Sequence, residues 1–113
     1  MAYDLDLANR IRECSGAEVG LTEQAMFGGL AFLINGNMSV SASGHGGLLL
    51  RIDPDQTDKL ATRAHAQRFV MRDREMSGWL RVDAAGVTTK RNLARWVAIS
   101  VAYARSLPPK GRT

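Results

Sequence analysis

The chain has 113 residues, the size of a single domain, and its 45% apolar and 23% charged residues are ordinary for a soluble globular protein. No apolar run approaches the ~20 residues needed to cross a bilayer, and the first residues lack the basic-then-apolar order of a signal peptide. Cys14 is the only cysteine, which excludes an internal disulfide. We therefore expect one domain over residues 1–113, located in the cytoplasm and not bound to a membrane.

The net charge of +4 conceals an asymmetry between the two halves of the chain. Residues 1–58 hold three basic and eight acidic side chains, a net charge of −5, whereas residues 59–113 hold twelve basic and three acidic ones, a net charge of +9. Such an asymmetry can indicate a surface for nucleic acid or an acidic partner. We favour the alternative that the two halves neutralise each other once the chain is folded or dimeric.

The first predicted element is a helix over residues 4–15. Asp4 can cap this helix, and apolar residues recur along one face at helical spacing. Cys14 falls on that face, so we interpret it as a packing residue rather than a nucleophile. Residues 17–25 are expected to form a loop, with a short helical turn starting near Thr22.

A β-hairpin is predicted over residues 28–43. Residues 30–34 are a continuous apolar run of strand length, and Asn35-Gly36 supplies the two positive-φ positions of a tight turn. In residues 38–43, apolar side chains alternate with serines, which is typical of a strand with one face in water. The hairpin therefore pairs an inner strand with a more exposed one.

Met26-Phe27-Gly28-Gly29 stands just before this hairpin. Two large apolar side chains are followed there by two residues without side chains. We expect a backbone bend at Gly28 and Gly29, with Met26 and Phe27 turned into the core.

A third strand is predicted over residues 47–52, after a glycine-rich turn at 44–47. Together with the hairpin it forms an antiparallel meander. Asp53 and Pro54 are suited to the cap and the first position of a short helix over residues 54–63.

Two further strands are predicted, at residues 68–72 and 79–82, joined by a charged connection at 73–78. Trp79 and Leu80 are expected on opposite faces of the second of these strands.

The last predicted element is a long helix over residues 89–107. Thr88 or Thr89 can cap it, and Pro108 helps to end it. Trp96 lies on its apolar face, so we expect this side chain to anchor the helix on the sheet.

The opposite face of this helix is basic. Arg91, Arg95 and Arg105 lie there, with Lys90 close by, and they could contact the phosphates of a nucleic acid. No helix-turn-helix, zinc-finger or ribonucleoprotein motif accompanies them, so we favour a solvated helix face over nucleic-acid binding.

Catalytic signatures are missing from the sequence. His45 and His65 have no second histidine or cysteine at ligand spacing, which gives no support for a zinc site. The glycines at 44–47 join two strands and precede no helix, unlike a phosphate loop. We therefore expect no cofactor and no enzymatic activity. A small-ligand protein or enzyme with a pocket under this turn is kept as an alternative.

Four short motifs resemble a known family. They are Met-Phe-Gly-Gly at 26–29, Asn-Gly-Asn-Met at 35–38, Leu-Leu-Arg-Ile-Asp at 49–53 and Gly-Trp-Leu-Arg-Val at 78–82. Over residues 5–107 the chain resembles the N-terminal domain of TfoX/Sxy-type regulators of competence genes.

The resemblance implies an α+β fold with a curved antiparallel sheet of about five strands, helices packed against it and the order α-βββ-α-ββ-α, similar to type III secretion chaperones. This order agrees with the one predicted from the residues. The resemblance also implies a non-enzymatic regulatory role, exercised with the cyclic-AMP receptor protein at competence promoters. Full-length regulators carry a second, helical domain, so we expect a stand-alone module here. Its expected partner is a protein, such as a component of the transcription machinery, or a second copy in a homodimer.

Two arginines stand out because each interrupts an apolar strand. Arg51 and Arg81 would form an anion-binding or partner-binding patch if they point to the same face of the sheet. The alternative is that both are simply exposed at alternate strand positions.

Overall fold

The computed structural model describes residues 3–26, 28–71 and 73–109. It contains a six-stranded sheet and helices, which confirms the predicted α+β class. In chain order the elements are α1 (Leu5–Ser15), β1 (Leu21–Met26), β2 (Gly29–Ile34), β3 (Asn37–Ala42), β4 (Leu48–Arg51), the 3₁₀ helix η1 (Pro54–Gln56), α2 (Thr57–Leu60), β5 (Ala66–Met71), β6 (Arg74–Val82), the 3₁₀ helix η2 (Ala84–Val87) and α3 (Lys90–Ser106).

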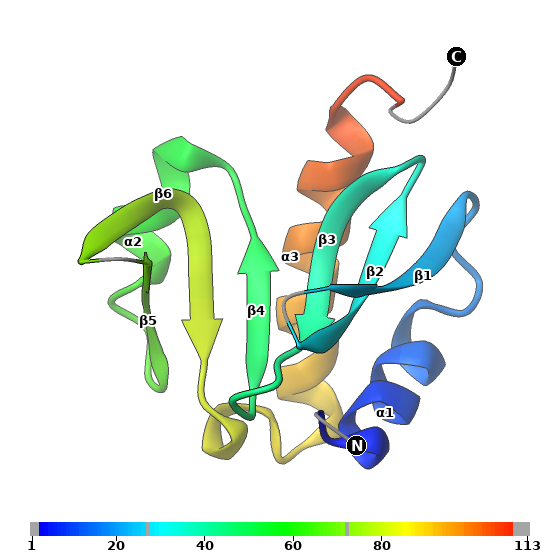
Figure 1. Cartoon of the computed structure of the whole chain (residues 1–113), viewed down its shortest axis with the longest axis horizontal. Helices are drawn as coiled ribbons and strands as arrows, with labels where there is room; N and C mark the ends of the chain where they lie inside the picture. Colours follow the sequence, from blue (N-terminus) through cyan, green and yellow to red (C-terminus); the bar gives the residue numbers. More distant parts are fainter. Residues whose placement is uncertain (1–2, 27, 72, 110–113) are drawn as a thin grey trace.

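The sheet is antiparallel throughout, with the strand order β1-β2-β3-β4-β6-β5. The chain leaves the sheet after β4, passes through η1 and α2, and returns as β5 at the far edge. Strand β6 then fills the place between β4 and β5. Figure 1 shows α3 behind β3, and α1 beside the lower end of α3. Within the described residues, helices therefore cover one face of the sheet and none covers the other.

The helix caps are those that the sequence predicts. The Asp4 carboxylate accepts a hydrogen bond from the Leu7 N–H at 3.2 Å, and the Thr89 hydroxyl accepts one from the Asn92 N–H at 3.1 Å. Asp53 likewise accepts from the N–H of Asp55. Each bond satisfies a backbone donor that has no partner inside its own helix.

The helix predicted over residues 54–63 is too long. In the structure this segment contains the short η1 followed by α2, which ends at Leu60. The chain has to reverse before it enters β5, and His65 completes this reversal with a φ of 66°. Thr57 and Leu60 are buried, and the Thr57 hydroxyl accepts a hydrogen bond from the N–H of Gly78.

The loop predicted over residues 17–25 is confirmed only at residues 17–20. For residues 21–25 the prediction of a loop is wrong, as is that of a helical turn near Thr22. Strand β1 occupies this segment and pairs with β2 without a break, from Leu21 opposite Ile34 to Met26 opposite Gly29. Its central side chains are all exposed, so its sequence shows no alternation of apolar and polar residues. The backbone of β2 specifies this strand, and the sheet therefore has six strands rather than five.

The Asn35-Gly36 turn is confirmed by φ values of 51° and 85°, and the strand predicted after it is present as β3. The prediction that one face of this strand is exposed to water is wrong. Every residue of β3 is buried. The hydroxyl of Ser39 donates to the Phe32 carbonyl at 2.7 Å, and that of Ser41 donates to the Ala42 carbonyl. Hydrogen-bonded hydroxyls can be buried at little cost, so an alternating pattern need not mean that one face is in water.

The strands predicted at 68–72 and 79–82 are confirmed as β5 and β6, with Arg72 outside the described residues. The charged connection predicted at 73–78 is mostly strand, because β6 begins at Arg74. Asp73, with a φ of 63°, provides the turn. Charged side chains are tolerated here because they lie near the exposed edge of the sheet.

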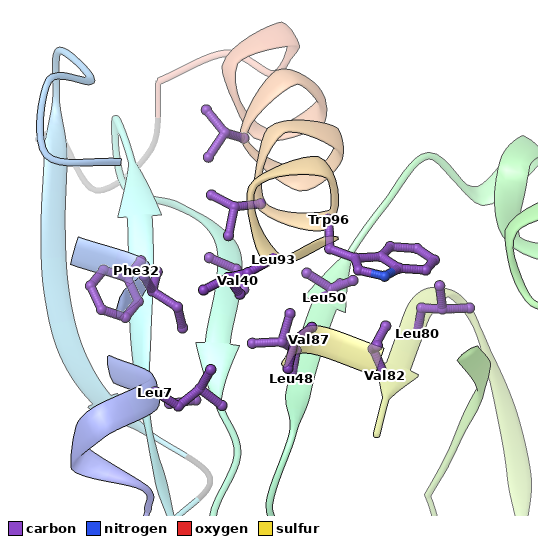
Figure 2. Packing of buried hydrophobic residues seen from close by; sticks show 14 of the residues in the cluster. Leu7, Phe32, Val40, Leu48, Leu50, Leu80, Val82, Val87, Leu93 and Trp96 are labelled. Carbon is purple, nitrogen blue, oxygen red and sulfur yellow. The ribbon is translucent and has the colours of Figure 1, made fainter. Parts of the chain in front are cut away.

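The main core lies between the sheet and helices α1 and α3. Trp96 of α3 is only 6% exposed, and Phe32 of β2 is fully buried. Figure 2 shows these side chains meeting others from α1, β3, β4, β6 and η2. The labelled members of this cluster are Leu7, Phe32, Val40, Leu48, Leu50, Leu80, Val82, Val87, Leu93 and Trp96.

Candidate functional site

The sheet face that carries no helix has an apolar cluster of its own. Its buried members come from the central strands β2, β3 and β4, and three partly buried side chains from β1, β5 and β6 pack against them. All seven are strand residues, so side chains from the outer strands protect the centre of this face. We call this set the helix-free cluster: Met26, Ala31, Leu33, Met38, Leu49, Phe69 and Trp79.

Met26, predicted from the sequence to lie in the core, instead lies partly accessible in this cluster, and so does Trp79. Leu80 lies on the opposite face in the main core, as predicted. Phe27 lies outside the described residues. Gly28 adopts a φ of 74°, and Gly29 is buried against the backbone of β3.

Arg51 and Arg81 begin on the same face of the sheet, because Arg51 stands opposite Trp79 and Arg81 opposite Leu49. Their side chains then contact different parts of the molecule. Arg81 donates to the Ser43 hydroxyl and the Gly46 carbonyl, both at 3.1 Å. The guanidinium carbon of Arg51 lies 5.8 Å from the centre of the Tyr103 ring. A shared anion-binding patch for the two arginines stays a prediction.

The glycine-rich turn at 44–47 packs directly on the end of β6. A Cβ atom at Gly47 would lie 2.2 Å from the carbonyl oxygen of Val82. The Arg81 guanidinium also lies against this turn, and His45 on it is exposed. This packing gives no support to a ligand pocket beneath the turn.

The basic residues of α3 are divided among different surroundings. Arg105 pairs with Glu18 at 2.8 Å and also donates to the Val19 carbonyl, which joins the basic and acidic halves of the chain. Lys90 borders a hollow beside α1 that also includes Glu13. Arg91 is exposed.

Arg95 lines a different hollow, together with Arg63 and His65 from the segment before β5. No spacing pattern relates positions 63–65 to position 95, because only the folded chain brings them together.

Arg12 of α1 and Glu23 of β1 form a two-bond ion pair. The guanidinium Nε and Nη2 atoms donate to the two carboxylate oxygens at 2.7 and 2.8 Å. These bonds hold the pKa of Glu23 below its usual value and raise the pKa of Arg12. The pair links the first helix to the edge of the sheet.

Glu23→Gln removes this ion pair. The free energy of unfolding is then expected to fall less steeply as the pH is lowered into the acid range. The pKa of Glu23 is lowered in the folded state. Its contribution to the free energy of unfolding is therefore fully present above about pH 4.3, which is the ordinary pKa of glutamate. The contribution is lost as the pH falls through the lowered pKa. Urea unfolding at pH 6 and pH 3 should show a smaller pH dependence in the variant. Equal pH dependence in both proteins would contradict this expectation.

Cys14 is half-buried on α1. Burial raises the pKa of its thiol, and the nearby Lys90 and Arg10 offset this shift only in part. A thiol held in its neutral form is a poor nucleophile, which agrees with a packing role.

Among residues 3–26, 28–71 and 73–109, no group of three or more His, Cys, Asp or Glu side chains is placed to hold a metal ion. In the same part of the chain, no helix combines the length and the hydropathy that a membrane span requires.

Comparison with protein families gives one match, to the TfoX N-terminal domain, over residues 17–104. The matched region includes all six strands and most of α3. No curated protein sequence and no solved structure matches the chain. Because the family model covers most of its length, the chain belongs to the TfoX N-terminal domain family.

Proposed function

We propose that this domain is a non-enzymatic regulatory module that binds a protein partner through the helix-free face of its sheet. The observation that carries the proposal is the helix-free cluster. Trp79, Phe69 and Met26 remain partly accessible there, on a face against which none of the described helices packs. Tryptophan and other large apolar side chains supply much of the energy at protein interfaces.

The edge of the sheet next to Met26 supports the same proposal. β1 is the first strand in the sheet order and pairs only with β2, and its residues 22–25 are exposed. An extended partner segment that paired with β1 would gain main-chain hydrogen bonds. Its side chains would then lie beside Met26 and the rest of the helix-free cluster.

Membership of the TfoX N-terminal domain family supports a regulatory role of this kind. The motifs at 26–29 and 78–82 also contribute Met26 and Trp79 to the proposed surface. We propose that the partner is a protein of the transcription machinery in the cytoplasm. A second copy of this chain is the competing occupant.

Trp79→Gln is expected to weaken partner binding by at least about thirtyfold without unfolding the domain. Loss of an interface tryptophan typically costs at least ~2 kcal/mol, which is about a thirtyfold loss of affinity. The tagged wild-type domain would first capture its partner from nuclease-treated lysate of the source organism. The identified protein would then be purified, and its affinity for wild-type and variant domains measured by calorimetry.

Leu5→Gln is the matched control, because Leu5 is an exposed apolar residue on α1, away from the helix-free cluster. It should bind the purified partner like the wild type. Equal affinity of Trp79→Gln and wild type would overturn the proposed surface. If light scattering gave the molar mass of a dimer for the wild type and of a monomer for Trp79→Gln, the surface would be assigned to self-association instead.

A further inference from the structure

A small hollow of about 160 Å³ lies where the segment between α2 and β5 meets the first half of α3. It is on the helix side of the sheet, so it is separate from the helix-free cluster. Its polar members come from two distant parts of the sequence. The residues that shape it are Arg63, His65, Gly86, Asn92, Arg95 and Trp96.

The hollow is positively charged. Arg63 and Arg95 line it, and none of its lining residues carries a carboxylate. Within the described part of the chain, the ion pairs involve neither of these arginines. The exposed Arg91 lies one helical turn before Arg95 and adds positive charge near the same side of α3.

Arg63 is exposed, and its side chain lies over a residue of the main core. Its guanidinium carbon lies 5.7 Å from the centre of the Trp96 ring, within the range of a cation–π interaction. Because Trp96 is itself only 6% exposed, the ring is a fixed support. A guanidinium that is already positioned loses less side-chain entropy when it binds a ligand.

The backbone next to Arg63 is also constrained. His65 has a φ of 66°, a conformation that is uncommon for residues other than glycine and often found at functional sites. Its carbonyl accepts from the Asp83 N–H at 2.9 Å. A Cβ atom at Gly86 would lie 2.6 Å from the Cβ of His65, so glycine is needed at the contact.

We propose that this hollow binds a phosphate group. At about 160 Å³ it is smaller than the roughly 300–1,000 Å³ of a pocket for a drug-sized ligand, so it suits a single compact group. Guanidinium groups match the oxygens of phosphate with paired hydrogen bonds, and the Asn92 side-chain amide adds a further donor. The Trp96 ring is covered by Arg63 and the core, so it offers no platform for a base. The site therefore recognises the phosphate rather than the molecule that carries it.

The phosphate could belong to a free nucleotide or to a nucleic-acid strand. Arg91 continues the positive charge along the start of α3, which would suit a neighbouring phosphate of a strand. This surface differs from the basic helix face predicted from the sequence. The proposed site includes Arg63 and His65 and does not include Arg105, which is paired with Glu18.

The test is an NMR titration of the ¹⁵N-labelled domain with inorganic phosphate, adenosine monophosphate and a 12-nucleotide single-stranded DNA at constant ionic strength. Binding at the site should shift the amides of residues 63–66 and 92–96 and the indole N–H of Trp96. Arg95→Gln should weaken binding about tenfold, as expected for one charge-assisted hydrogen-bonding partner. Arg63→Gln combined with Arg95→Gln should abolish it.

Arg74→Gln is the charge-matched control, because Arg74 is exposed at the start of β6 and does not line the hollow. It should bind phosphate like the wild type. Similar affinities for phosphate and the nucleotide would assign a free ligand. Much tighter binding of DNA, which weakens when its titration is repeated at a higher salt concentration, would assign a strand. Absence of shifts with all three probes, or an equal loss in Arg74→Gln, would overturn the proposal. An unchanged amide spectrum outside the site would verify that each variant is folded.

Discussion

Trp96→Ala is expected to lower the free energy of unfolding by about 3–5 kcal/mol, as large-to-small core substitutions of tryptophan do. The side chain joins α3 to the sheet in the main core, where it is 6% exposed. Its loss would leave a cavity bordered by several elements that cannot all collapse into it. Since small domains have about 5–15 kcal/mol of stability in total, this variant should be near its limit of folding at 37 °C. Urea denaturation followed by circular dichroism measures the effect.

Trp79→Ala provides the comparison, because Trp79 is half-buried in the helix-free cluster. Trp79→Ala removes the same type of side chain from a more accessible position, so the decrease in the free energy of unfolding should be about half as large. Equal losses for the two tryptophans would contradict the assignment of Trp96 to the main core. So would a loss below about 1 kcal/mol for Trp96→Ala.

Features of the fold that depend on neighbouring residues could be predicted from the sequence. Asp4 and Thr89 cap helices because their side chains reach backbone N–H groups three residues away. The turn at Asn35-Gly36 follows from the backbone freedom of these two residues. Each of these interactions spans only a few positions, so the local sequence contains all of its participants.

Features that depend on distant pairing could not be predicted in this way. β1 has exposed side chains and no periodicity, and it is a strand because β2 offers free backbone groups beside it. The burial of Ser39 likewise depends on the carbonyl of Phe32 in the neighbouring strand, which accepts a hydrogen bond from its hydroxyl. The pattern of polar and apolar residues in the sequence reveals neither the pairing of β1 with β2 nor the contact between Ser39 and Phe32.

The same distinction applies to the basic residues of α3. Helical spacing correctly places Arg91 and Arg95 on the outer side of the helix, where both are exposed. The spacing does not reveal that Arg105 meets Glu18 or that Arg95 shares a hollow with Arg63. Those contacts depend on where the chain segments at 17–20 and 61–65 cross the helix. The candidate phosphate site is therefore a product of tertiary structure.

Gly29→Ala is expected to lower the free energy of unfolding by about 3 kcal/mol, the upper part of the usual range for overpacking. A Cβ atom there would lie 2.2 Å from the Ala42 carbonyl oxygen and 3.2 Å from the Gly44 nitrogen. Both are backbone atoms, so the clash cannot be relieved by rotating a side chain. Strands β2 and β3 would have to separate where Leu30 pairs with Ala42. Thermal unfolding should show a fall in Tm of about 12 °C, at roughly 4 °C for each kcal/mol.

Gly28→Ala is the matched variant, one residue earlier in the same motif. Its Cβ would have nothing within 4 Å, but its φ of 74° is unfavourable for alanine. The expected loss is about 1 kcal/mol, which comes from backbone conformation alone. The two variants thus separate a steric requirement for glycine from a conformational one. If Gly28→Ala were the more damaging of the two, the close approach of β2 and β3 at Gly29 would be refuted, and the bend at Gly28 would be the feature that the Met-Phe-Gly-Gly motif preserves.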